Sequence, residues 1–420
     1  MRLELVTIGD ELLLGFTVDT NAAYMARELA GIGVEIVRRA TCGDEPDAIA
    51  EAVGDALRRT GAVITTGGLG PTSDDRTKES IAALFGRGMR LDEEILQRLE
   101  ERWVARFKQP LPAPNRQQAM IPEGAVVLTN RHGSAPGIWL EDNAGHWVAM
   151  LPGVPREMRG MLGDELIPRL TTRLGAAAVV RSATLRTTGI AESLLAEQLG
   201  DVARGVDGLP LAYLPGPDGV DLRLTARGLP ADVAERALNT GIAALREKTG
   251  RFAYATGSAD LAEVVLDLCR AKGLTIATGE SCTGGMLVER LTAIPGSSDV
   301  VVGGIIAYSN AIKSEFLGVD PELIATHGAV SEPVARAMAE GARDRLRAAI
   351  GVGITGIAGP GGATPGKPVG TVDLAVAGPW PTEARRSQFI GDREEIRYRA
   401  SQAALNMIRL RLDFTDYGIF

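Results

Sequence analysis

A serine and a cysteine lie side by side in a segment that could perform nucleophilic chemistry. Residues 277–285 read ATGESCTGG, follow the apolar run Leu274–Ala277 and precede the amphipathic run Met286–Leu291. This order predicts a strand, a tight glycine-containing turn and a helix whose free N–H groups could hold a phosphate or stabilise an oxyanion. The helix-start field would help to ionise either Ser281 or Cys282. A structural interpretation also stands, in which Ser281 only caps the helix.

Two further segments could complete such a site. The sequence YSNAIK follows the apolar run Val300–Ala307, which places Tyr308 at a predicted strand end and Lys313 early in a helix. Only 6 of the 45 basic residues are lysines, so Lys313 and Lys367 are candidates for a role that needs a deprotonatable amine. Residues 354–362, ITGIAGPGG, could wrap a glycine-rich backbone around a phosphate, or could form a flexible surface connection.

The three motifs together resemble the carboxy-terminal domain of the CinA family. The resemblance runs from Ala259 to about Asp413, with the motifs in the family's order. This domain is a nicotinamide mononucleotide (NMN) deamidase in its PncC-type members, so the resemblance implies a serine amidohydrolase without a cofactor. The implied catalytic residues are Ser281, Tyr308 and Lys313. The implied substrate-binding residues are Glu280, Cys282, Thr283, Gly284, Gly285, Asn310, Thr355, Gly356, Gly359, Gly361, Gly362 and Lys367.

The nucleophile can be assigned from its neighbours. Cys282 is intrinsically the better attacking group, but no histidine lies near it in the sequence to activate it. Ser281 has a candidate base in Lys313, which can titrate if the pocket desolvates it, and Tyr308 could relay or donate a proton. We therefore predict that Ser281 attacks and that the N–H groups of residues 282–284 face the oxyanion.

A second group of candidate residues follows predicted strands near the amino terminus. Asp10 and Glu11 end the first strand, and residues 67–75, GGLGPTSDD, end the third. The glycines suit close approach of the backbone to a phosphate, although their spacing is not the dinucleotide fingerprint. Because Mg²⁺ prefers few carboxylates plus substrate phosphate, Asp10 or Glu11 could share one cation with Asp74 or Asp75. The last two could equally be ordinary helix-start acids.

The elements that must position these groups alternate between strand and helix. Buried strands are predicted at Leu3–Ile8, Val34–Val37 and Ala62–Thr66, and amphipathic helices at Thr20–Ile32 and Pro46–Leu57. This alternation predicts a doubly wound α/β domain with a mostly parallel sheet. In such sheets ligands bind beyond the carboxyl ends of the strands, where the candidate residues lie.

The glycine–aspartate loop carries a second resemblance. Residues 66–77, TGGLGPTSDDRT, resemble the molybdopterin-binding fold of MoaB and MogA proteins. Together with GDE at 9–11 and LPGVPRE at 151–157, they also resemble the amino-terminal domain of the CinA family over residues 1 to about 170. Fold similarity does not settle the substrate. The length of the 151–158 segment and the fused deamidase favour the CinA branch.

In that branch the amino-terminal domain hydrolyses ADP-ribose to AMP and ribose 5-phosphate with a divalent cation, Mg²⁺ or a similar transition metal. The resemblance then implies cation ligands at Glu11, Asp74 and Asp75. The implied substrate-binding residues are Gly67, Gly68, Gly70, Thr72, Ser73, Ser134, Pro152 and Gly153.

Residues 173–257 predict a small α+β module between the two ends. Its GPDG sequence at 216–219 has the GxxG spacing of RNA-binding KH domains, but it lies between the predicted strands Pro210–Leu214 and Asp221–Ala226. A hairpin turn explains it better, and no basic cluster supports RNA binding. We predict a KH-like spacer. The expected domains are 1–172, a MoaB/MogA-like ADP-ribose pyrophosphatase; 173–257, the spacer; and 258–420, an α/β NMN deamidase.

Composition restricts the partners and the compartment. Of the 420 residues 45% are hydrophobic, and the net charge of −8 argues against bulk attraction to nucleic acid or anionic membrane. The cysteines, Cys42, Cys269 and Cys282, show neither a disulfide framework nor zinc spacing. With no signal peptide or apolar span of about 18 residues, we expect a soluble cytoplasmic protein. The family resemblance implies a homodimer.

Two classes of function remain open. The first is a bifunctional hydrolase of pyridine-nucleotide recycling, because NMN and ADP-ribose are both breakdown products of NAD. The second is a competence-associated protein that binds a nucleotide or molybdopterin without turnover at the amino-terminal site. The intact set of Ser281, Tyr308, Lys313, Asp74 and Asp75 favours the first.

Overall fold

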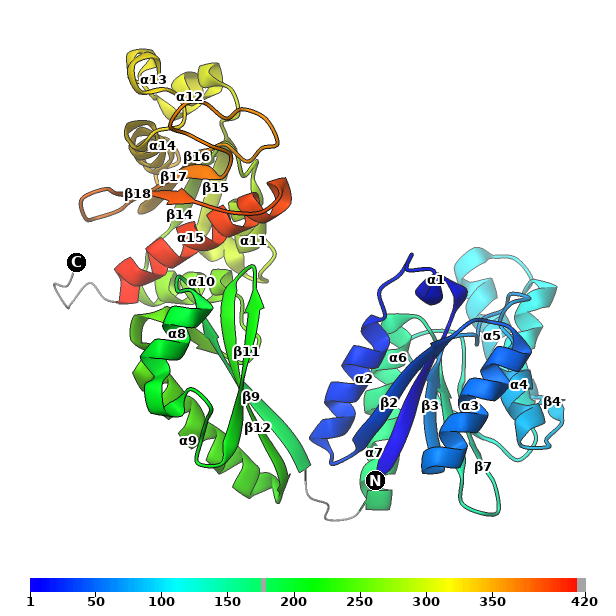
Figure 1. Cartoon of the computed structure of the whole chain (residues 1–420). Helices are drawn as coiled ribbons and strands as arrows, with labels where there is room; N and C mark the ends of the chain where they lie inside the picture. The colour runs from blue at the N-terminus through cyan, green and yellow to red at the C-terminus, as the bar shows by residue number, and fades with distance from the viewer. Residues whose placement is uncertain (175–178, 414–420) are drawn as a thin grey trace. The chain divides into compact units, whose positions relative to one another are not determined.

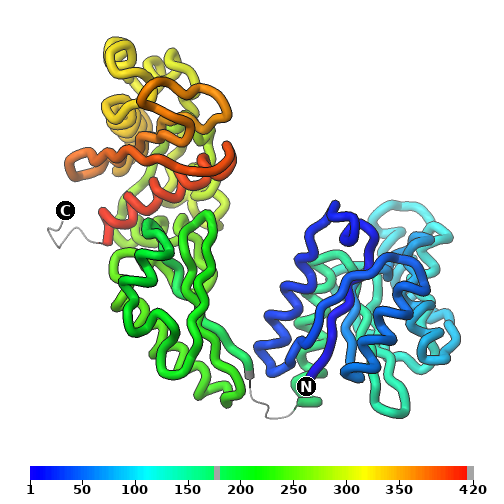
Figure 2. Tube along the Cα trace, viewed as in Figure 1, coloured from blue at the N-terminus to red at the C-terminus, as the bar shows by residue number. Residues whose placement is uncertain are grey.

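The computed structural model describes residues 1–174 and 179–413 (Figure 1). The chain divides into two compact units, Met1–Arg181 with Ala226–Arg236 and Ser182–Thr225 with Ala237–Phe420. Figure 2 traces the backbone through both. Within the described residues no helix combines the length and the apolar character needed to cross a membrane.

The amino-terminal unit alternates strands and helices, as predicted. Its elements are β1 Arg2–Ile8, α1 Asp10–Leu13, α2 Thr20–Gly31, β2 Glu35–Cys42, α3 Pro46–Thr60, β3 Ala62–Thr66, α4 Thr77–Leu84, β4 Met89–Leu91, α5 Glu93–Phe107, η1 Ala113–Ala119, β5 Met120–Pro122, β6 Val126–Leu128, β7 Gly137–Glu141, β8 Trp147–Leu151, α6 Pro155–Met161, η2 Leu162–Leu166 and α7 Ile167–Leu174. The main sheet has the order β2–β1–β3–β8–β7–β6, parallel from β2 to β8 and antiparallel at β7 and β6.

Helices cover both faces of this sheet because its strands are apolar on both sides (Figure 1). Val63 points into the core shared with α3, α4 and α5, whereas its neighbour Ile64 points into the core shared with α2, α6 and α7. The doubly wound architecture is thus confirmed. One local expectation is wrong: Asp74 and Asp75 do not begin a helix, because α4 begins at Thr77 and both acids belong to the preceding turn.

The middle module is a sheet with helices packed on it. Its elements are β9 Val179–Thr187, α8 Glu192–Leu199, η3 Gly200–Val202, β10 Gly205–Val206, β11 Leu209–Gly216, β12 Gly219–Leu229, α9 Ala231–Thr249, η4 Gly250–Phe252 and β13 Ala253–Thr256. The strand order is β10–β11–β12–β9–β13. Gly216 pairs with Gly219 across a two-residue turn, so the GPDG sequence is a β-hairpin, as predicted.

The carboxy-terminal domain has a mixed sheet of order β15–β14–β16–β17–β18. Its elements are α10 Leu261–Lys272, β14 Ile276–Glu280, α11 Met286–Thr292, η5 Ser297–Asp299, β15 Val301–Ile306, α12 Asn310–Leu317, α13 Pro321–His327, α14 Glu332–Arg345, β16 Ile350–Gly356, β17 Thr371–Ala377, β18 Glu383–Gln388 and α15 Arg393–Asp413. Helices α10, α11 and α15 pack on one face, and α12, α13 and α14 on the other (Figure 1). Strands β14, β15 and β16 are parallel, so their carboxyl ends share one edge of the sheet.

Candidate functional site

The shared edge of the carboxy-terminal sheet brings the three predicted motifs together. Ser281 follows β14, Tyr308 follows β15, and the glycine-rich loop follows β16. They surround a cavity of about 260 Å³. Its lining residues are Ser281, Cys282, Tyr308, Asn310, Lys313, Ala329, Val330, Thr355, Gly356, Ile357, Ala358, Gly359, Gly361, Gly362 and Arg393.

Ser281 and Lys313 form the centre of this cavity. The Lys313 Nζ lies 3.0 Å from the Ser281 Oγ, and both side chains are buried. The carbonyl oxygens of Ala307, at 2.9 Å, and Tyr308, at 3.4 Å, also contact this nitrogen. Within the described residues no carboxylate forms an ion pair with Lys313, and burial lowers the pKa of its amine. A neutral amine can donate both hydrogens to the carbonyls while its lone pair accepts the Ser281 hydroxyl proton.

Cys282 is placed for packing rather than for attack. Burial is the main cause that raises the pKa of its thiol to about 12; the carboxylate of Glu280 acts in the same direction, whereas nearby backbone N–H groups and Lys313 act against it. The thiol therefore stays protonated at neutral pH and is a weak nucleophile. An added Cβ on Gly356 would lie 3.0 Å from the Cys282 Sγ, so the glycine loop needs glycine to pass this close to the sulfur.

Glu280 does not face the cavity, and its predicted contact with substrate is wrong. Its buried carboxylate accepts hydrogen bonds from the N–H groups of Gly285 at 3.1 Å, Leu287 at 3.0 Å and Val288 at 2.9 Å. These are the amides at the start of α11. The carboxylate of Glu280 thus caps this helix, not Ser281, and no free helix start remains to hold an anion.

Of the three predicted oxyanion donors, at residues 282–284, only Cys282 lines the cavity. The N–H of Gly284 donates to the Ser281 carbonyl oxygen at 3.1 Å. The N–H groups of Cys282 and Thr283 have no oxygen acceptor in the described part of the chain. Thr283, Gly284 and Gly285 do not line the cavity, because the turn carries them away from it, and the Thr283 carbonyl instead accepts hydrogen bonds from Arg397.

Tyr308 and Arg393 lie at the mouth of the cavity. The Tyr308 side chain is 63% exposed, and its hydroxyl accepts a hydrogen bond from Arg393 at 3.0 Å, so it points away from the Ser281–Lys313 pair. The predicted proton relay through this hydroxyl therefore lacks its contact. Arg393 also donates to the carbonyl oxygen of Gly359 at 2.6 Å, which joins it to the glycine loop. Sequence analysis missed Arg393, whose only signal is a basic residue at the start of the last helix.

The other predicted contacts divide into two groups. Asn310, Thr355, Gly356, Gly359, Gly361 and Gly362 line the cavity. Lys367 does not, because its Nζ donates to the carbonyl oxygen of His327 at 3.0 Å and lies outside the lining.

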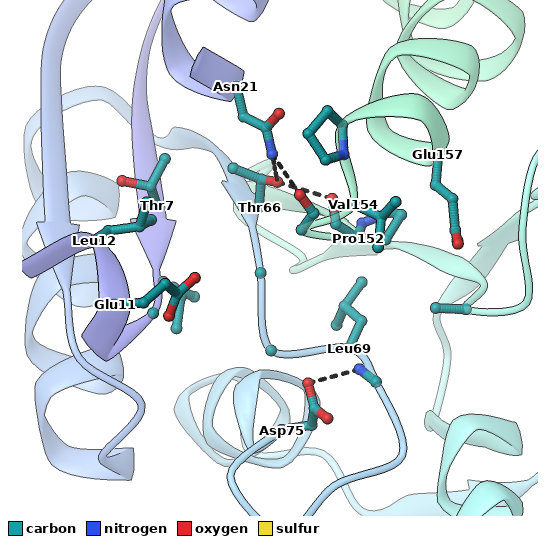
Figure 3. A pocket seen from close by; sticks show the side chains of 18 of the residues that line it. Thr7, Glu11, Leu12, Asn21, Thr66, Leu69, Asp75, Pro152, Val154 and Glu157 are labelled. Carbon is teal, nitrogen blue, oxygen red and sulfur yellow. Dashed lines mark hydrogen bonds between the residues drawn. The ribbon is translucent and has the colours of Figure 1, made fainter. Parts of the chain in front are cut away.

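A second cavity, of about 440 Å³, lies beyond the carboxyl ends of β1 and β3 in the amino-terminal unit (Figure 3). The predicted residues that line it are Gly67, Gly68, Gly70, Ser134, Pro152, Gly153, Glu11, Asp74 and Asp75. Thr72 and Ser73 do not line it. The hydroxyl and N–H of Thr72 turn instead to the Asp75 carboxylate, and the Ser73 carbonyl oxygen accepts from Arg76.

Acidic side chains dominate this amino-terminal cavity. The acidic lining residues are Glu11, Asp19, Asp44, Asp74, Asp75 and Glu157. No lysine, arginine or histidine lines it among the described residues. Burial raises the pKa of Asp44, and the negative charges of Asp10, Glu11 and Asp74 act in the same direction. The carboxylates at this cavity therefore repel one another. An anionic ligand cannot enter such a cavity without positive charge of its own or an accompanying cation.

The predicted cation ligands are not equivalent. Asp75 accepts hydrogen bonds from the N–H groups of Gly70 at 2.7 Å and Thr72 at 2.8 Å, one on each carboxylate oxygen, so it shapes the loop. In the part of the chain that the structure describes, no three His, Cys, Asp or Glu side chains are grouped as metal ligands. Glu11 and Asp74 remain as hard oxygen donors. Two carboxylates with substrate phosphate fit the preference of Mg²⁺.

Two amide side chains offer hydrogen-bond acceptors in the same cavity. Asn21 donates through its Nδ2 to the Gly153 carbonyl oxygen at 2.7 Å and to the Thr66 hydroxyl at 3.3 Å (Figure 3). Its Oδ1 is buried without a partner in the described residues, as is the Oε1 of Gln118. Buried acceptors are rarely left unpaired, so both suit a ligand with hydroxyl or amino donors. Neither residue was predicted, since lone amides carry no motif.

Comparison with known proteins identifies each region. Residues 4–172 match the family described as "Probable molybdopterin binding domain", 182–255 the "Damage-inducible protein CinA KH domain" and 258–412 the "CinA C-terminal domain". A CinA-like protein of Gemmatimonas aurantiaca is 64% identical over 97% of this chain and 96% of its own. One from Chlorobaculum tepidum is 43% identical over 99% of this chain and 100% of its own.

Solved structures match single parts of the chain. The competence/damage inducible protein CihA of Agrobacterium tumefaciens is 41% identical over 36% of this chain and 93% of that one, with a TM-score of 0.35. The molybdopterin biosynthesis enzyme MoaB of Thermus thermophilus is 23% identical over 41% of this chain and 94% of that one, with a TM-score of 0.28. The identity to full-length relatives and the order of the three matched families make this chain a member of the CinA family.

Proposed function

We propose that the carboxy-terminal domain is a serine amidohydrolase that converts NMN to nicotinate mononucleotide and ammonia. The observation that carries this proposal is the buried Ser281–Lys313 pair, with its Oγ–Nζ distance of 3.0 Å, in a cavity at the sheet edge. A buried lysine that has no carboxylate partner does not stabilise the fold through an ion pair. It serves well as a base, because burial favours the neutral amine.

The reaction follows from these positions. Lys313 takes the hydroxyl proton as the Ser281 Oγ attacks the carboxamide carbon, and the N–H group of Cys282, which lines the cavity, faces the developing oxyanion. Lys313 then returns the proton to the leaving nitrogen, and ammonia departs from an acyl-serine. Water, deprotonated by the same amine, hydrolyses this ester and restores the serine.

Arg393 and the glycine loop would hold the phosphate of NMN. The Arg393 guanidinium lies at the mouth of the cavity, against the loop carbonyl of Gly359. An arginine fork suits phosphate oxygens, and a positive charge here also offsets the phosphate's charge. With Arg393 and Ser281 in the same lining, the cavity suits a ligand that carries both a phosphate and an amide.

We also propose that the amino-terminal cavity hydrolyses ADP-ribose to AMP and ribose 5-phosphate with a divalent cation. The carboxylate lining without any basic residue supports this, because a diphosphate can bind there only with its charge neutralised. Glu11 and Asp74 would hold the cation, which supplies charge neutralisation and polarises the phosphoryl oxygen. Asp75 fixes the glycine loop, while Asn21 and Gln118 accept hydrogen bonds from sugar or base donors.

The alternative is binding without turnover at the amino-terminal site. The matched molybdopterin-binding family favours it, since the same fold binds a pterin in other proteins. Incubation of the full chain with NMN, ADP-ribose or molybdopterin, each with and without Mg²⁺, separates the candidates. Release of ammonia from NMN and of AMP from ADP-ribose supports both proposed hydrolases. Tight binding of molybdopterin with no AMP release would replace the second.

We propose that the protein forms a homodimer and takes small-molecule nucleotides as ligands. The edge strand β15 exposes apolar side chains, with Val302 47% and Ile306 53% exposed, and Phe316 of the following helix α12 is 49% exposed. An unpaired apolar edge strand is a surface that a second copy would cover. Sedimentation analysis of the wild type and of Ile306→Lys tests this, with a monomeric wild type as the contrary result.

A further inference from the structure

The middle module is held against the last helix by its hairpin. Asp218, at the tip of the GPDG turn, accepts a hydrogen bond from the Tyr398 hydroxyl at 2.6 Å, and its carbonyl oxygen accepts from the Gln402 amide at 2.9 Å. The Asp218 carboxylate also pairs with Arg186 at 2.8 Å. The KH-like turn is therefore occupied by contacts within the chain, and most of the module, Ser182–Thr225 and the residues from Ala237 on, belongs to the carboxy-terminal unit (Figure 2).

A cavity of about 430 Å³ opens beside this contact and belongs to neither candidate active site. Its walls are the segment 188–192, the hairpin residues 215–220, β18 with Phe389, and one side of α15. Apolar side chains form part of the wall, among them Ile190, Phe389 and Met407. We call it the seam cavity.

Two arginines of the seam cavity lack partners. Arg385, which is exposed, and Arg399, which is partly buried, both line it, and neither side chain forms an ion pair or a hydrogen bond with another described residue. The Nε of Arg399 is fully buried without an acceptor. Nearby arginines are satisfied: Arg386 donates to both oxygens of Asp373, at 2.9 and 3.0 Å, and Arg290 pairs with Asp260 at 2.9 Å. A buried donor without an acceptor is costly, which points to an acceptor supplied by a ligand.

The acidic side chains at this cavity do not cancel the two guanidinium charges. Asp218 is committed to Arg186 and Tyr398, and Glu383 pairs with Arg411 at 2.7 Å. Glu192 is the remaining carboxylate of the lining; it is exposed, as Arg385 is, so the partly buried Arg399 is left without a counter-charge. The field inside the cavity therefore favours an anion.

We propose that the seam cavity binds an anionic ligand of mononucleotide size. Its phosphate would lie between Arg385 and Arg399, which offer planar donor groups suited to phosphate oxygens, and its base would cover the apolar wall at Phe389. The site is linked to the deamidase cavity by α15. The same helix carries Arg393 at the mouth of that cavity and Arg397, which donates to the carbonyl oxygen of Thr283 at 2.8 Å. A ligand in the seam cavity would therefore contact α15, the helix that also holds the loop carrying Ser281.

Hydrogen–deuterium exchange of the full chain with AMP as the probe tests this site by location. AMP should slow exchange in the segments 188–194 and 383–389 of the wild type. Arg399→Gln and Arg385→Gln should each raise the AMP concentration for half-maximal protection at least about tenfold, as loss of a charge-assisted contact predicts. The matched control Arg236→Gln removes an equal charge from an exposed helix surface, and it should behave as the wild type.

Two companion probes define the ligand. Adenosine, which lacks the anion, should give no protection of these segments at the same concentration. Inorganic phosphate should protect less than AMP, because it cannot cover the apolar wall. Absence of AMP protection in the wild type, protection unchanged in both arginine variants, or equal protection by adenosine or by phosphate would overturn the proposal. Protection of the amino-terminal cavity by AMP does not interfere, since it appears in different peptides.

Discussion

The two candidate active sites occupy equivalent places in their sheets and carry opposite charge. Both lie beyond the carboxyl ends of parallel strands. The carboxy-terminal cavity is served by Lys313 and Arg393, and the nearest buried carboxylate, Glu280, is turned away into the start of α11. The amino-terminal cavity collects carboxylates and, within the described residues, no basic side chain. One site holds its own positive charge, whereas the other must receive it with the ligand.

This difference shows that topology fixes where a site lies and not what it does. The residues that follow the strands decide the chemistry: Ser281 after β14 and Tyr308 after β15 in one sheet, Glu11 after β1 and Asp74 after β3 in the other. A shared edge of parallel strands offers short loops in both cases. Only the loop sequences separate a pocket with a serine–lysine pair from one lined with carboxylates.

Removal of divalent cations should have the largest effect, because it should abolish one of the two activities and spare the other. A chelator should reduce ADP-ribose hydrolysis to background, because nothing in the amino-terminal lining neutralises a diphosphate. It should leave NMN deamidation unchanged, since Ser281 and Lys313 need no cation. Both rates are measured on one preparation, with added Mg²⁺ to restore the lost one. Equal loss of both activities would contradict the division of charge described above.

Replacement of the nucleophile should be the next largest effect. Ser281→Ala should lower the deamidation rate roughly 10³-fold or more, as expected for removal of an attacking group. Cys282→Ala should keep most of the activity, because its thiol is protonated and buried. ADP-ribose hydrolysis by the same variants provides the folding control. The serine mechanism is excluded if the cysteine variant is inactive and the serine variant turns over.

Replacement of the base should lower the deamidation rate less than replacement of the nucleophile, and it should alter the pH profile. Lys313→Arg puts a permanently charged group in place of the titratable amine and cannot accept a proton, so deamidation should fall by roughly 10²-fold or more. In the wild type the neutral amine is the active form, and burial lowers its pKa below the ordinary value. The value of kcat/KM should therefore rise as pH rises through this lowered pKa and fall as the amine is protonated. A flat profile from neutral to alkaline pH, with an active Lys313→Arg variant, would remove Lys313 from the mechanism.

The smallest effect should come from the phosphate contact. Arg393→Gln should raise the KM for NMN about ten- to a hundredfold, the equivalent of losing a hydrogen bond to a charged group. Nicotinamide riboside, which lacks the phosphate, serves as the matched substrate. The variant and the wild type should convert it at similar efficiency. A comparable loss with both substrates would show that Arg393 acts on the loop through Gly359 and not on the phosphate.

The alternation of strand and helix was enough to predict the amino-terminal fold, because apolar runs such as Ala62–Thr66 are buried on both faces. Strand β18 was missed for the opposite reason. It reads EARRSQ, with no apolar pattern, and it forms a strand because it pairs with β17 along the sheet edge. Its Arg386 satisfies the fully buried Asp373 across that pair, a relation that a linear sequence does not display.

The candidate site shows the same limit at the level of side chains. Motifs indicated Ser281, Lys313 and the glycine loop, since each stands beside a strand end. They could not show that Glu280 turns back to cap α11, because a carboxylate next to a nucleophile can point either way. The sequence did not predict Arg393 at the cavity, because its position depends on how α15 packs back against the sheet edge.

The contacts of α15 restrict which segments can be exchanged when a chimaera is made from this protein and a relative. Tyr398 and Gln402 hold the hairpin at Asp218, while Arg393 and Arg397 reach the loops of the carboxy-terminal cavity. A chimaera that took the middle module from one relative and α15 from another would disturb both sets of contacts at once. Crossover points that work would therefore transfer the two segments together, although 180 residues separate Asp218 from Tyr398.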